Sequence, residues 1–328
     1  MTVSPFIVKL TAGRHKDYIL SIMELGKTRQ IRGTDGALMK RATYASVSVA
    51  CFLILLKFFA WLATDSVAIL STLVDSVLDA LASLVTVFAI RHALTPADRE
   101  HRFGHGKAEP LAGVGQAAFI AGSATLVLFE ASRRLWQPQP VNDSEIGIAV
   151  MLASILLTGI LVIYQRYVVR KTGSIAIKGD SVHYVGDLLT NVAVIASLLV
   201  GQRLGWLALD PILGAAIACY LLFSAWQVVK VALNMLMDHE LPDQARKRIK
   251  QLALNHPDVA AIHDLRTRAS GPQRFIQFHL EMSGNLSLTR AHEVSDAVEA
   301  AVTTEFPDAE VIIHQDPTEL DEPHTRFT

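Results

Sequence analysis

Residues 67–90 read VAILSTLVDSVLDALASLVTVFAI, and Asp75 and Asp79 are the only charged residues among them. A helix needs about 20 mainly apolar residues to cross the roughly 30 Å hydrocarbon core of a membrane. The stretch therefore predicts a transmembrane helix. Its two carboxylates are informative, because a charged side chain at mid-bilayer costs at least about 2.5–3.5 kcal/mol and usually marks function.

Stretches of the same apolar character lie on both sides of this one. With it they make six predicted spans, at about residues 43–63, 67–90, 111–132, 146–165, 177–200 and 209–233. Only 19% of the 328 residues are charged, whereas a soluble domain carries about a quarter. The composition excludes an ordinary soluble enzyme, a disordered chain and a secreted disulfide scaffold. A net charge of −1 gives no reason to expect nucleic acid as a partner.

The distribution of Lys and Arg predicts how the spans are oriented. The loops at 91–109 and 166–174 are richer in these residues than the loops on the other side. The segment before the first span adds Lys27, Arg29 and Arg32. Because Lys and Arg gather in short cytoplasmic loops, both termini are expected in the cytoplasm.

After Asp238 the composition becomes that of a small soluble domain. Helices are predicted at 241–255 and 288–306, and strands at 259–268, 274–282 and 310–314. This αββαβ order predicts two helices packed on one face of a sheet. We therefore expect a mostly α membrane protein. Its expected parts are an N-terminal extension (1–38), a six-helix transmembrane domain (39–237), a cytoplasmic domain (238–317) and a disordered tail (318–328). Residues 1–38 are either a cytoplasmic extension or, with Met39 as the start, not native.

Two of the spans carry pairs of potential metal ligands. Asp75 and Asp79 are four residues apart, as are His183 and Asp187, so each pair lies on one helix face. Three carboxylates and an imidazole would complete a tetrahedral site for a divalent cation. The alternative is that neighbouring hydroxyl groups satisfy the carboxylates.

Other polar residues of the spans have simpler interpretations. Lys57, Glu130 and Lys230 are isolated and are interpreted as structural, since a long side chain can reach the membrane surface. Asp180, one turn before His183, could line the approach to the site. Asn191, four residues after Asp187, could support that ligand.

Two further clusters of potential ligands lie outside the spans. Asp98, His101 and His105 are close in one loop, where Gly104 and Gly106 supply backbone freedom. The alternative there is an ordinary solvated polar loop. The soluble domain contains a larger set, which could hold two ions or could be surface histidines and consists of His263, His279, His292, His314 and Asp316.

The motifs that contain these residues resemble the cation diffusion facilitator family, in particular its bacterial zinc and ferrous-iron efflux proteins. The resemblance runs from about residue 33 to residue 317 through the motifs LVD75SVLD79, FGH105GK107AE, H183YVGD187, H263DLRTR and H314QD316P. It implies a homodimer in the bacterial inner membrane with a metallochaperone-like cytoplasmic domain. It also implies a transport site at Asp75, Asp79, His183 and Asp187, a loop site, a binuclear cytoplasmic site, and a charge interlock between Lys107 and Asp238.

Export of a divalent cation against an inside-negative potential costs about 4.6 kcal/mol per 100 mV. The chain has no Walker A motif, because His101 stands where the first glycine is needed, and Arg170 replaces the acceptor of a P-type phosphorylation motif. Histidine titrates near neutral pH and must be deprotonated to bind metal. We therefore predict a zinc(II)/proton antiporter that works by alternating access.

The substrate is expected to be Zn²⁺, followed by Fe²⁺ and Cd²⁺, with protons as counter-ion and Zn²⁺ also as regulator. The alternative is a metal-gated cation channel or sensor. An enzyme is not expected, because an intramembrane zinc protease needs His-Glu-x-x-His and the chain has only His239-Glu-Leu-Pro-Asp243.

Overall fold

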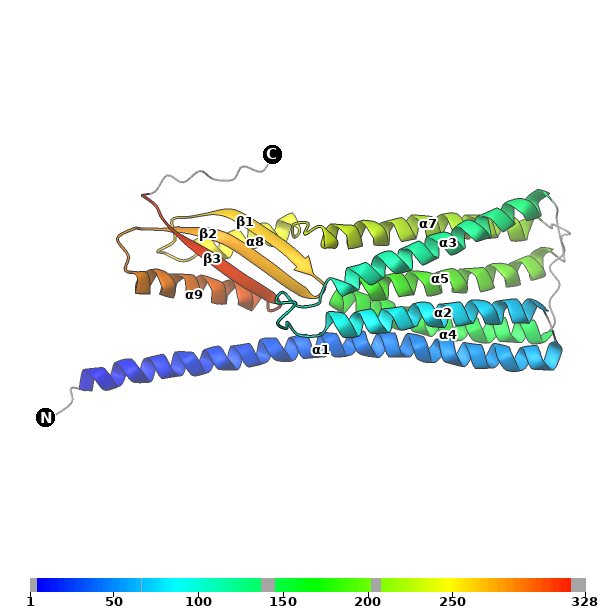
Figure 1. Cartoon of the computed structure of the whole chain (residues 1–328), viewed down its shortest axis with the longest axis horizontal. Coiled ribbons are helices and arrows are strands. Elements are labelled where there is room, and N and C mark those ends of the chain that lie inside the picture. The colour runs from blue at the N-terminus through cyan, green and yellow to red at the C-terminus, as the bar shows by residue number, and fades with distance from the viewer. Residues whose placement is uncertain (1–4, 66, 137–144, 202–207, 320–328) are drawn as a thin grey trace. The chain divides into compact units, whose positions relative to one another are not determined.

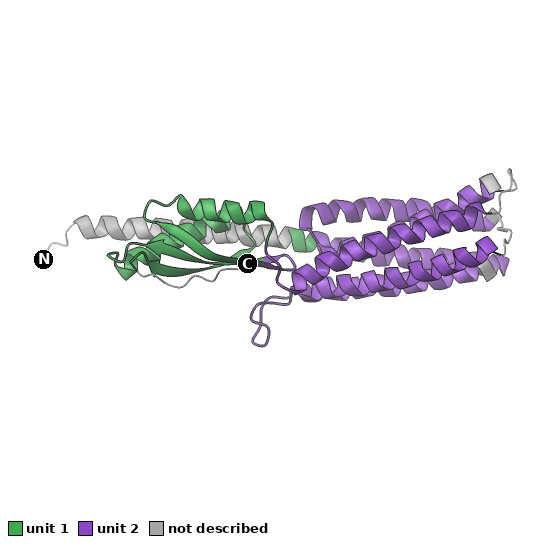
Figure 2. Cartoon of the chain, turned by 90° about the horizontal axis from the view of Figure 1, so that it is seen from above, with its two compact units in different colours: residues 1–37, 241–267, 274–328 green, residues 38–240, 268–273 purple. Residues whose placement is uncertain are grey.

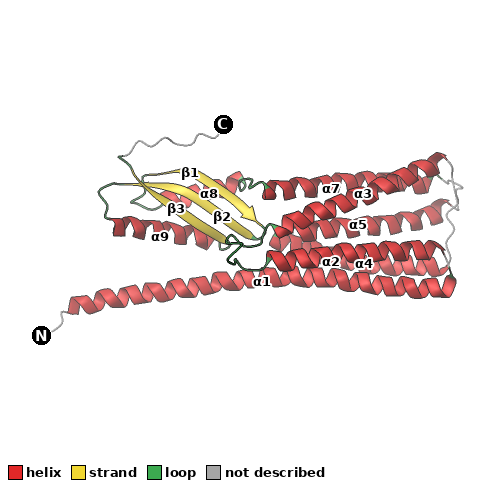
Figure 3. Cartoon of the chain, viewed as in Figure 1, coloured by secondary structure: helices red, strands yellow, loops and turns green. Residues whose placement is uncertain are grey.

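A computed structural model describes residues 5–65, 67–136, 145–201 and 208–319 of the chain. The apolar part consists of helices that run side by side (Figures 1 and 3). They are α1 (Pro5–Thr64), α2 (Val67–Ala93), α3 (Ala108–Trp136), α4 (Glu145–Thr172), α5 (Ile175–Ala196) with a π-helical end η1 (Ser197–Gly201), and α7 (Leu209–Leu236). Among the described residues, six helices have the length and composition to cross a membrane, as predicted.

Several ends of these helices follow from local chemistry. Gly173, at φ 68°, ends α4 and donates its N–H to the carbonyl of Val169. Ser174 then caps α5 by accepting the N–H of Ile177. The carboxylate of Glu109, at the start of α3, accepts the N–H of Ile175 at 2.7 Å. Together the last two bonds satisfy buried N–H groups at the beginning of α5 that have no partner within the helix.

The first helix is longer than the sequence pattern indicated. It begins at Pro5, although the predicted span begins at about residue 43. No proline interrupts the chain between Pro5 and the end of α1, so the polar residues before the span continue the helix. Most of the predicted breaks at 138–145 and 201–206 and most of the predicted tail at 318–328 lie outside the described residues, although Glu145 already belongs to α4 and Gly201 to η1.

The helical bundle has small residues at some of its buried contacts and large apolar residues on its outer faces. One buried cluster joins α3, α5 and α7 through Ala117, Ile175, Ala225 and Ala232, and small residues let membrane helices approach closely. On the outer faces, large apolar side chains are exposed on α1, α2, α3, α4 and α7, for example Phe59, Phe88, Phe129, Ile163 and Trp226. A surface of this kind suits lipid rather than water.

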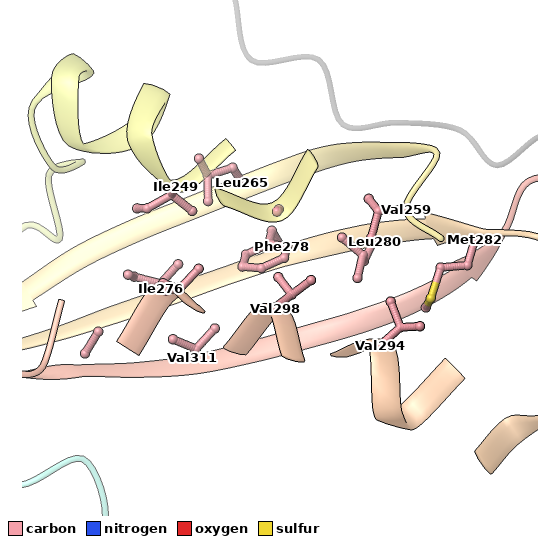
Figure 4. Packing of buried hydrophobic residues seen from close by; sticks show 13 residues of the cluster. Ile249, Val259, Leu265, Ile276, Phe278, Leu280, Met282, Val294, Val298 and Val311 are labelled. Carbon is pink, nitrogen blue, oxygen red and sulfur yellow. The ribbon is translucent and has the colours of Figure 1, made fainter. Parts of the chain in front are cut away.

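The C-terminal part is a three-stranded sheet with two helices. Its elements are α8 (Asp243–Leu254), β1 (Ala261–Ser270), β2 (Gln273–Met282), α9 (Leu288–Glu305) and β3 (Ala309–Pro317). The strand order is β1-β2-β3, and β2 pairs with β3 in parallel. Ile249 of α8 and Val298 of α9 share one core with Phe278 of β2 (Figure 4). The predicted αββαβ order and the packing of both helices on one face are confirmed.

The chain divides into two compact units, which Figure 2 colours separately. The membrane unit contains residues 38–240 together with 268–273, the turn between β1 and β2. The C-terminal unit contains residues 241–267 and 274–328, together with 1–37.

Candidate metal centres

Helices α2 and α5 bring three of the four predicted transport-site residues together. A carboxylate oxygen Oδ1 of Asp79 lies 2.7 Å from Nε2 of His183, and Oδ2 of Asp187 lies 3.8 Å from the same nitrogen. The three side chains offer ligand atoms that all lie within 4.8 Å of one another. Oδ2 of Asp187 is buried without a hydrogen-bond partner. This donor set fits a divalent cation bound by nitrogen and oxygen.

The fourth predicted residue, Asp75, lies outside this group. It is on α2 one turn before Asp79, and its side chain is exposed. Beside it, Lys57 of α1 donates to the hydroxyl of Ser76 at 2.7 Å and to the carbonyl of Thr72 at 3.1 Å. Lys57, interpreted from the sequence as isolated, thus ties α1 to the ligand-bearing helix.

The residues around the site differ in part from the sequence interpretation. Asn191 donates to the main-chain carbonyl of Asp187 rather than to its carboxylate. Asp180 is 1% exposed and so does not line an open approach. Phe119 of α3 packs against the imidazole of His183 with ring centroids 5.5 Å apart. The sequence held no signal for this last contact, because it depends on how α3 packs against α5.

The loop between α2 and α3 brings Asp98, His101 and His105 together. Asp98 lies 3.5 Å from Nδ1 of His101 and 3.4 Å from Nε2 of His105. The N–H of His101 donates to Asp98 at 2.6 Å and holds the pKa of that carboxyl below its ordinary value. Nδ1 of His105 is buried without a hydrogen-bond partner. The set fits a metal ion bound by nitrogen and oxygen.

The two glycines of this loop have definite roles. Gly104 has φ 76°, a conformation that glycine adopts readily. At Gly106, an added Cβ would lie 2.1 Å from the carbonyl oxygen of Ser270 in the turn between β1 and β2. The loop also contacts His92, which the sequence analysis did not single out and whose ring centroid lies 4.5 Å from that of His105.

The sheet brings together a third group of ligands, one from each strand. His263 of β1, His279 of β2 and Asp316 of β3 offer atoms within 4.8 Å of one another. Oδ2 of Asp316 lies 2.7 Å from Nδ1 of His279 and 3.3 Å from Nε2 of His263. Oε1 of Glu281, a residue that the sequence analysis missed, lies 3.4 Å from His263.

The other two predicted members of this group are placed differently. His314 lies 3.1 Å from Oδ1 of Asp316, but its side chain is 64% exposed. His292, on α9, is 70% exposed and faces Asp296 at 3.5 Å instead. In one chain the strands therefore assemble three ligands with His314 beside them, and His292 lies apart.

The predicted charge interlock is a close contact in the membrane unit. Nζ of Lys107 lies 3.0 Å from Oδ1 of Asp238, and Arg268 adds a second contact to that oxygen at 3.3 Å. Burial works against ionisation of Asp238, but hydrogen bonds from Lys107 and Arg268 outweigh it, so the pKa of this carboxyl is lowered. Arg268 also stacks over Phe103, and neither residue was predicted from the sequence.

Six apolar helices with an imidazole–carboxylate cluster in two of them, followed by a histidine-bearing sheet, define a membrane transporter of metal cations. Comparison with known proteins supports that class. The family described as cation efflux transmembrane domain matches residues 43–237, and the one described as cation efflux protein, cytoplasmic domain, matches residues 241–318. The chain belongs to the cation efflux family, as its motifs predicted.

Named relatives match most of the chain. The cation-efflux pump FieF of Salmonella choleraesuis (strain SC-B67) is 46% identical over 284 residues, 87% of this chain and 94% of that protein. FieF of Shewanella oneidensis is 46% identical over 288 residues, 88% of this chain and 97% of that protein. A solved metal-bound C-terminal domain of the CzcD transporter from Thermotoga maritima is 28% identical, with 24% of this chain and 93% of that one covered and a TM-score of 0.23. These relatives are named for transport, not for an enzymatic reaction.

Proposed function

We propose that this chain exports a divalent metal cation in exchange for protons, with Zn²⁺ as the first candidate substrate and Fe²⁺ and Cd²⁺ next. The observation that carries the proposal is the group Asp79, His183 and Asp187, whose ligand atoms lie within 4.8 Å of one another on two apolar helices. Nitrogen and oxygen ligands suit these cations without selecting sharply among them. Asp75, one turn from Asp79, is proposed as the fourth ligand.

Competition between metal and protons couples the two fluxes. An imidazole and two carboxylates must be deprotonated to bind a cation. Protons and metal therefore compete for the same atoms, and metal that binds from the cytoplasm is displaced by protons when the site faces outward. A rearrangement of α2 against α5 would give alternating access to the group.

The other two centres are proposed as regulatory. Zn²⁺ held by the loop group and by the sheet group would stabilise a homodimer in the bacterial inner membrane, with both termini in the cytoplasm. The description of residues 241–318 as a cytoplasmic domain of cation efflux proteins supports this placement. His292 would join the sheet group as its remaining ligand, and Lys107 with Asp238 would hold the dimer near the membrane surface.

Zinc flux into vesicles with an imposed pH gradient tests the proposal. Asp79→Asn and Asp187→Asn keep the size of the side chain, and each is expected to lower gradient-driven zinc flux at least about 100-fold, since each removes a ligand. Glu130→Gln is the matched control, because Glu130 is a carboxylate in a span that pairs with Arg134 at 3.0 Å instead. Flux that ignores the gradient would favour a channel. Flux that survives both ligand variants would contradict the assigned site.

A further inference from the structure

Five buried polar residues lie about one helical turn from the proposed transport site and take no part in the mechanism above. We call them the Asp180 network; each is at most 1% exposed, and they are Ser46 of α1, Ser83 of α2, Gln165 of α4, and Asp180 and Tyr184 of α5. Buried polar groups of this kind need partners, because an unsatisfied one costs about 1–3 kcal/mol. The network connects four of the six helices.

Asp180 is the centre of the network. Its Oδ2 accepts hydrogen bonds from Ser46 and from the amide of Gln165, each at 2.7 Å. Its Oδ1 accepts from Ser83 at 3.1 Å. Hydroxyl and amide groups thus donate to both carboxylate oxygens. These donors satisfy the carboxylate of Asp180. Their hydrogens point at its oxygens, where a bound cation would have to lie, so the network is not a second metal site.

The network forms a second contact between the two ligand-bearing helices. Ser83 follows Asp79 by four residues on α2, and Asp180 precedes His183 by three on α5, so each lies on the face of its ligand. The bond from Ser83 to Asp180 is therefore adjacent to the contact of Asp79 with His183. Tyr184, the neighbour of His183, lies 2.9 Å from the hydroxyl of Ser83 and donates to the carbonyl of Ser46 at 3.3 Å.

We propose that Asp180 is a positioning residue for the transport site: in the state that binds metal, its bond with Ser83 fixes how far α2 is displaced along α5, so that Asp79 and His183 meet at metal-binding distance. This inference rests on the proposed function. A slip of α2 by one residue would move Asp79 by about 1.5 Å. That displacement approaches the roughly 2.0–2.2 Å length of a Zn–O bond. Residues that orient ligands typically change metal affinity about 10- to 100-fold when they are mutated.

Substitution of Asp180 by Asn tests whether Asp180 acts through its hydrogen bonds, which position the helices, or through its negative charge. The amide oxygen of Asn can accept from Ser46 and Gln165, and its NH2 can donate to Ser83, whose hydroxyl then donates to Tyr184. All the links remain without a carboxylate. Asp180→Asn should therefore function nearly as the wild type does, whereas Asp180→Ala removes the bond from Ser83 to Asp180 and leaves only the weaker contact of Ser83 with Tyr184 beside the ligands.

A matched pair of variants separates helix positioning from general stability. Ser83 and Gln165 are both 0% exposed and both bond to Asp180, but only Ser83 is on a ligand-bearing helix. Ser83→Ala should disturb the ligands. Gln165→Leu should not, although it also removes a buried hydrogen bond, because α4 carries none of the proposed ligands.

The test is the KM for zinc in gradient-driven vesicle flux with the full chain. We expect Asp180→Ala to raise KM about 10- to 100-fold and Ser83→Ala to raise it about threefold to tenfold. Asp180→Asn and Gln165→Leu should leave it within about twofold of the wild type. A merely structural role would lower the amount of active protein, and so the maximal rate, without changing KM.

Three results would overturn the inference: an unchanged KM in Asp180→Ala and Ser83→Ala, an equal rise in Gln165→Leu and Ser83→Ala, or a rise in Asp180→Asn as large as in Asp180→Ala. If Asp180→Ala does not fold, Ser83→Ala and Gln165→Leu decide. The proposed function fails separately, when the wild type shows no gradient-driven flux or when Asp79→Asn keeps it.

Discussion

The ligand clusters of the two units use the same residue types on different frameworks. In the membrane unit, Asp79, His183 and Asp187 come from two helices, and in the C-terminal unit His263, His279 and Asp316 come from three strands. Ligands four residues apart on one helix share a face whatever the rest of the chain does. Ligands on three strands meet only when the strands pair in one register. In the first cluster only the pair of His183 and Asp187 therefore follows from local sequence, because Asp79 joins it through the packing of α2 against α5. In the second cluster all three ligands meet only through strand pairing.

The two frameworks also differ in how they can move. Strands β2 and β3 are paired over nine positions, from Arg274 with Ala309 to Met282 with Pro317. That ladder cannot shift without breaking backbone hydrogen bonds. Helices satisfy their own backbone groups, so α2 and α5 are joined only by side chains and can shift as rigid bodies. A site on two helices suits release of a substrate, and a site on a paired sheet suits retention of an ion.

The largest expected effect separates the clusters by their roles. His183→Ala should lower gradient-driven zinc flux at least about 100-fold, because it removes a proposed ligand of the transported ion. Asp316→Ala should lower it less than about tenfold, because the sheet group is outside the transport path. Flux measurements on vesicles with equal amounts of reconstituted protein compare the two variants. An equal loss of zinc flux in the two variants would show that both clusters lie on one transport pathway, and it would contradict the separate roles proposed for them.

The same contrast explains what could be predicted from the sequence. The spans, the order of helices and strands along the chain and the pairs of potential ligands on α2 and α5 follow from periodicities of about 3.6 and 2 residues, which are local properties. The placement of Asp75 outside the group of Asp79, His183 and Asp187 does not follow from local periodicity. The side of α2 that faces α5 depends on the packing of the whole bundle. The partners of Lys57 could not be predicted for the same reason, because Thr72 and Ser76 are on another helix, although the structural interpretation of Lys57 agrees with these bonds.

The sheet group shows the limit of this reasoning more clearly. The histidines of β1 and β2 could be assigned to strands from their sequence, but their meeting with Asp316 requires the parallel pairing of β2 with β3. Glu281 was missed because its neighbour His263 is 18 positions earlier in the chain, on another strand. His292 was included for its residue type and because the family resemblance implies a binuclear site, and in one chain α9 places its side chain beside Asp296.

A smaller effect tests whether the sheet retains its ion. Zn²⁺ at about 1,000 times its Kd should stabilise a site that only the folded state forms by about 4 kcal/mol. Hydrogen exchange of β1, β2 and β3 in the full chain should then be slower with Zn²⁺ than with a chelator. Asp316→Ala should abolish this difference. Asp258→Ala is the control, since Asp258 is a carboxylate of the same domain that pairs with Arg290 at 2.6 Å instead. A zinc effect that persists in Asp316→Ala would contradict the assigned site.

The smallest expected effect is on the free energy of unfolding and concerns Asp238. Its ion pairs with Lys107 and Arg268 hold the end of α7 in place. The pKa of Asp238 is lowered, so the pairing stabilises the fold above the ordinary value of about 3.9 and loses its effect as the pH falls below that value. The side chain of Asp238 is 41% exposed, so we expect Asp238→Asn to lower the free energy of unfolding by only about 0.5–1 kcal/mol.

Thermal unfolding of the wild type and Asp238→Asn across a range of pH measures this difference. It should be constant from about pH 5 to pH 8 and should disappear in stronger acid, where Asp238 is protonated in both the folded and the unfolded chain. Asp243→Asn is the matched control, because the Asp243 side chain is 85% exposed and pairs only with Arg246 at 3.5 Å.

Zinc flux at neutral pH tests whether the ion pairs of Asp238 change during transport. If they do, Asp238→Asn should change the flux and Asp243→Asn should not. Equal flux in Asp238→Asn and Asp243→Asn, combined with the pH-dependent loss of stability, would place the moving parts of the membrane unit at α2 and α5 instead.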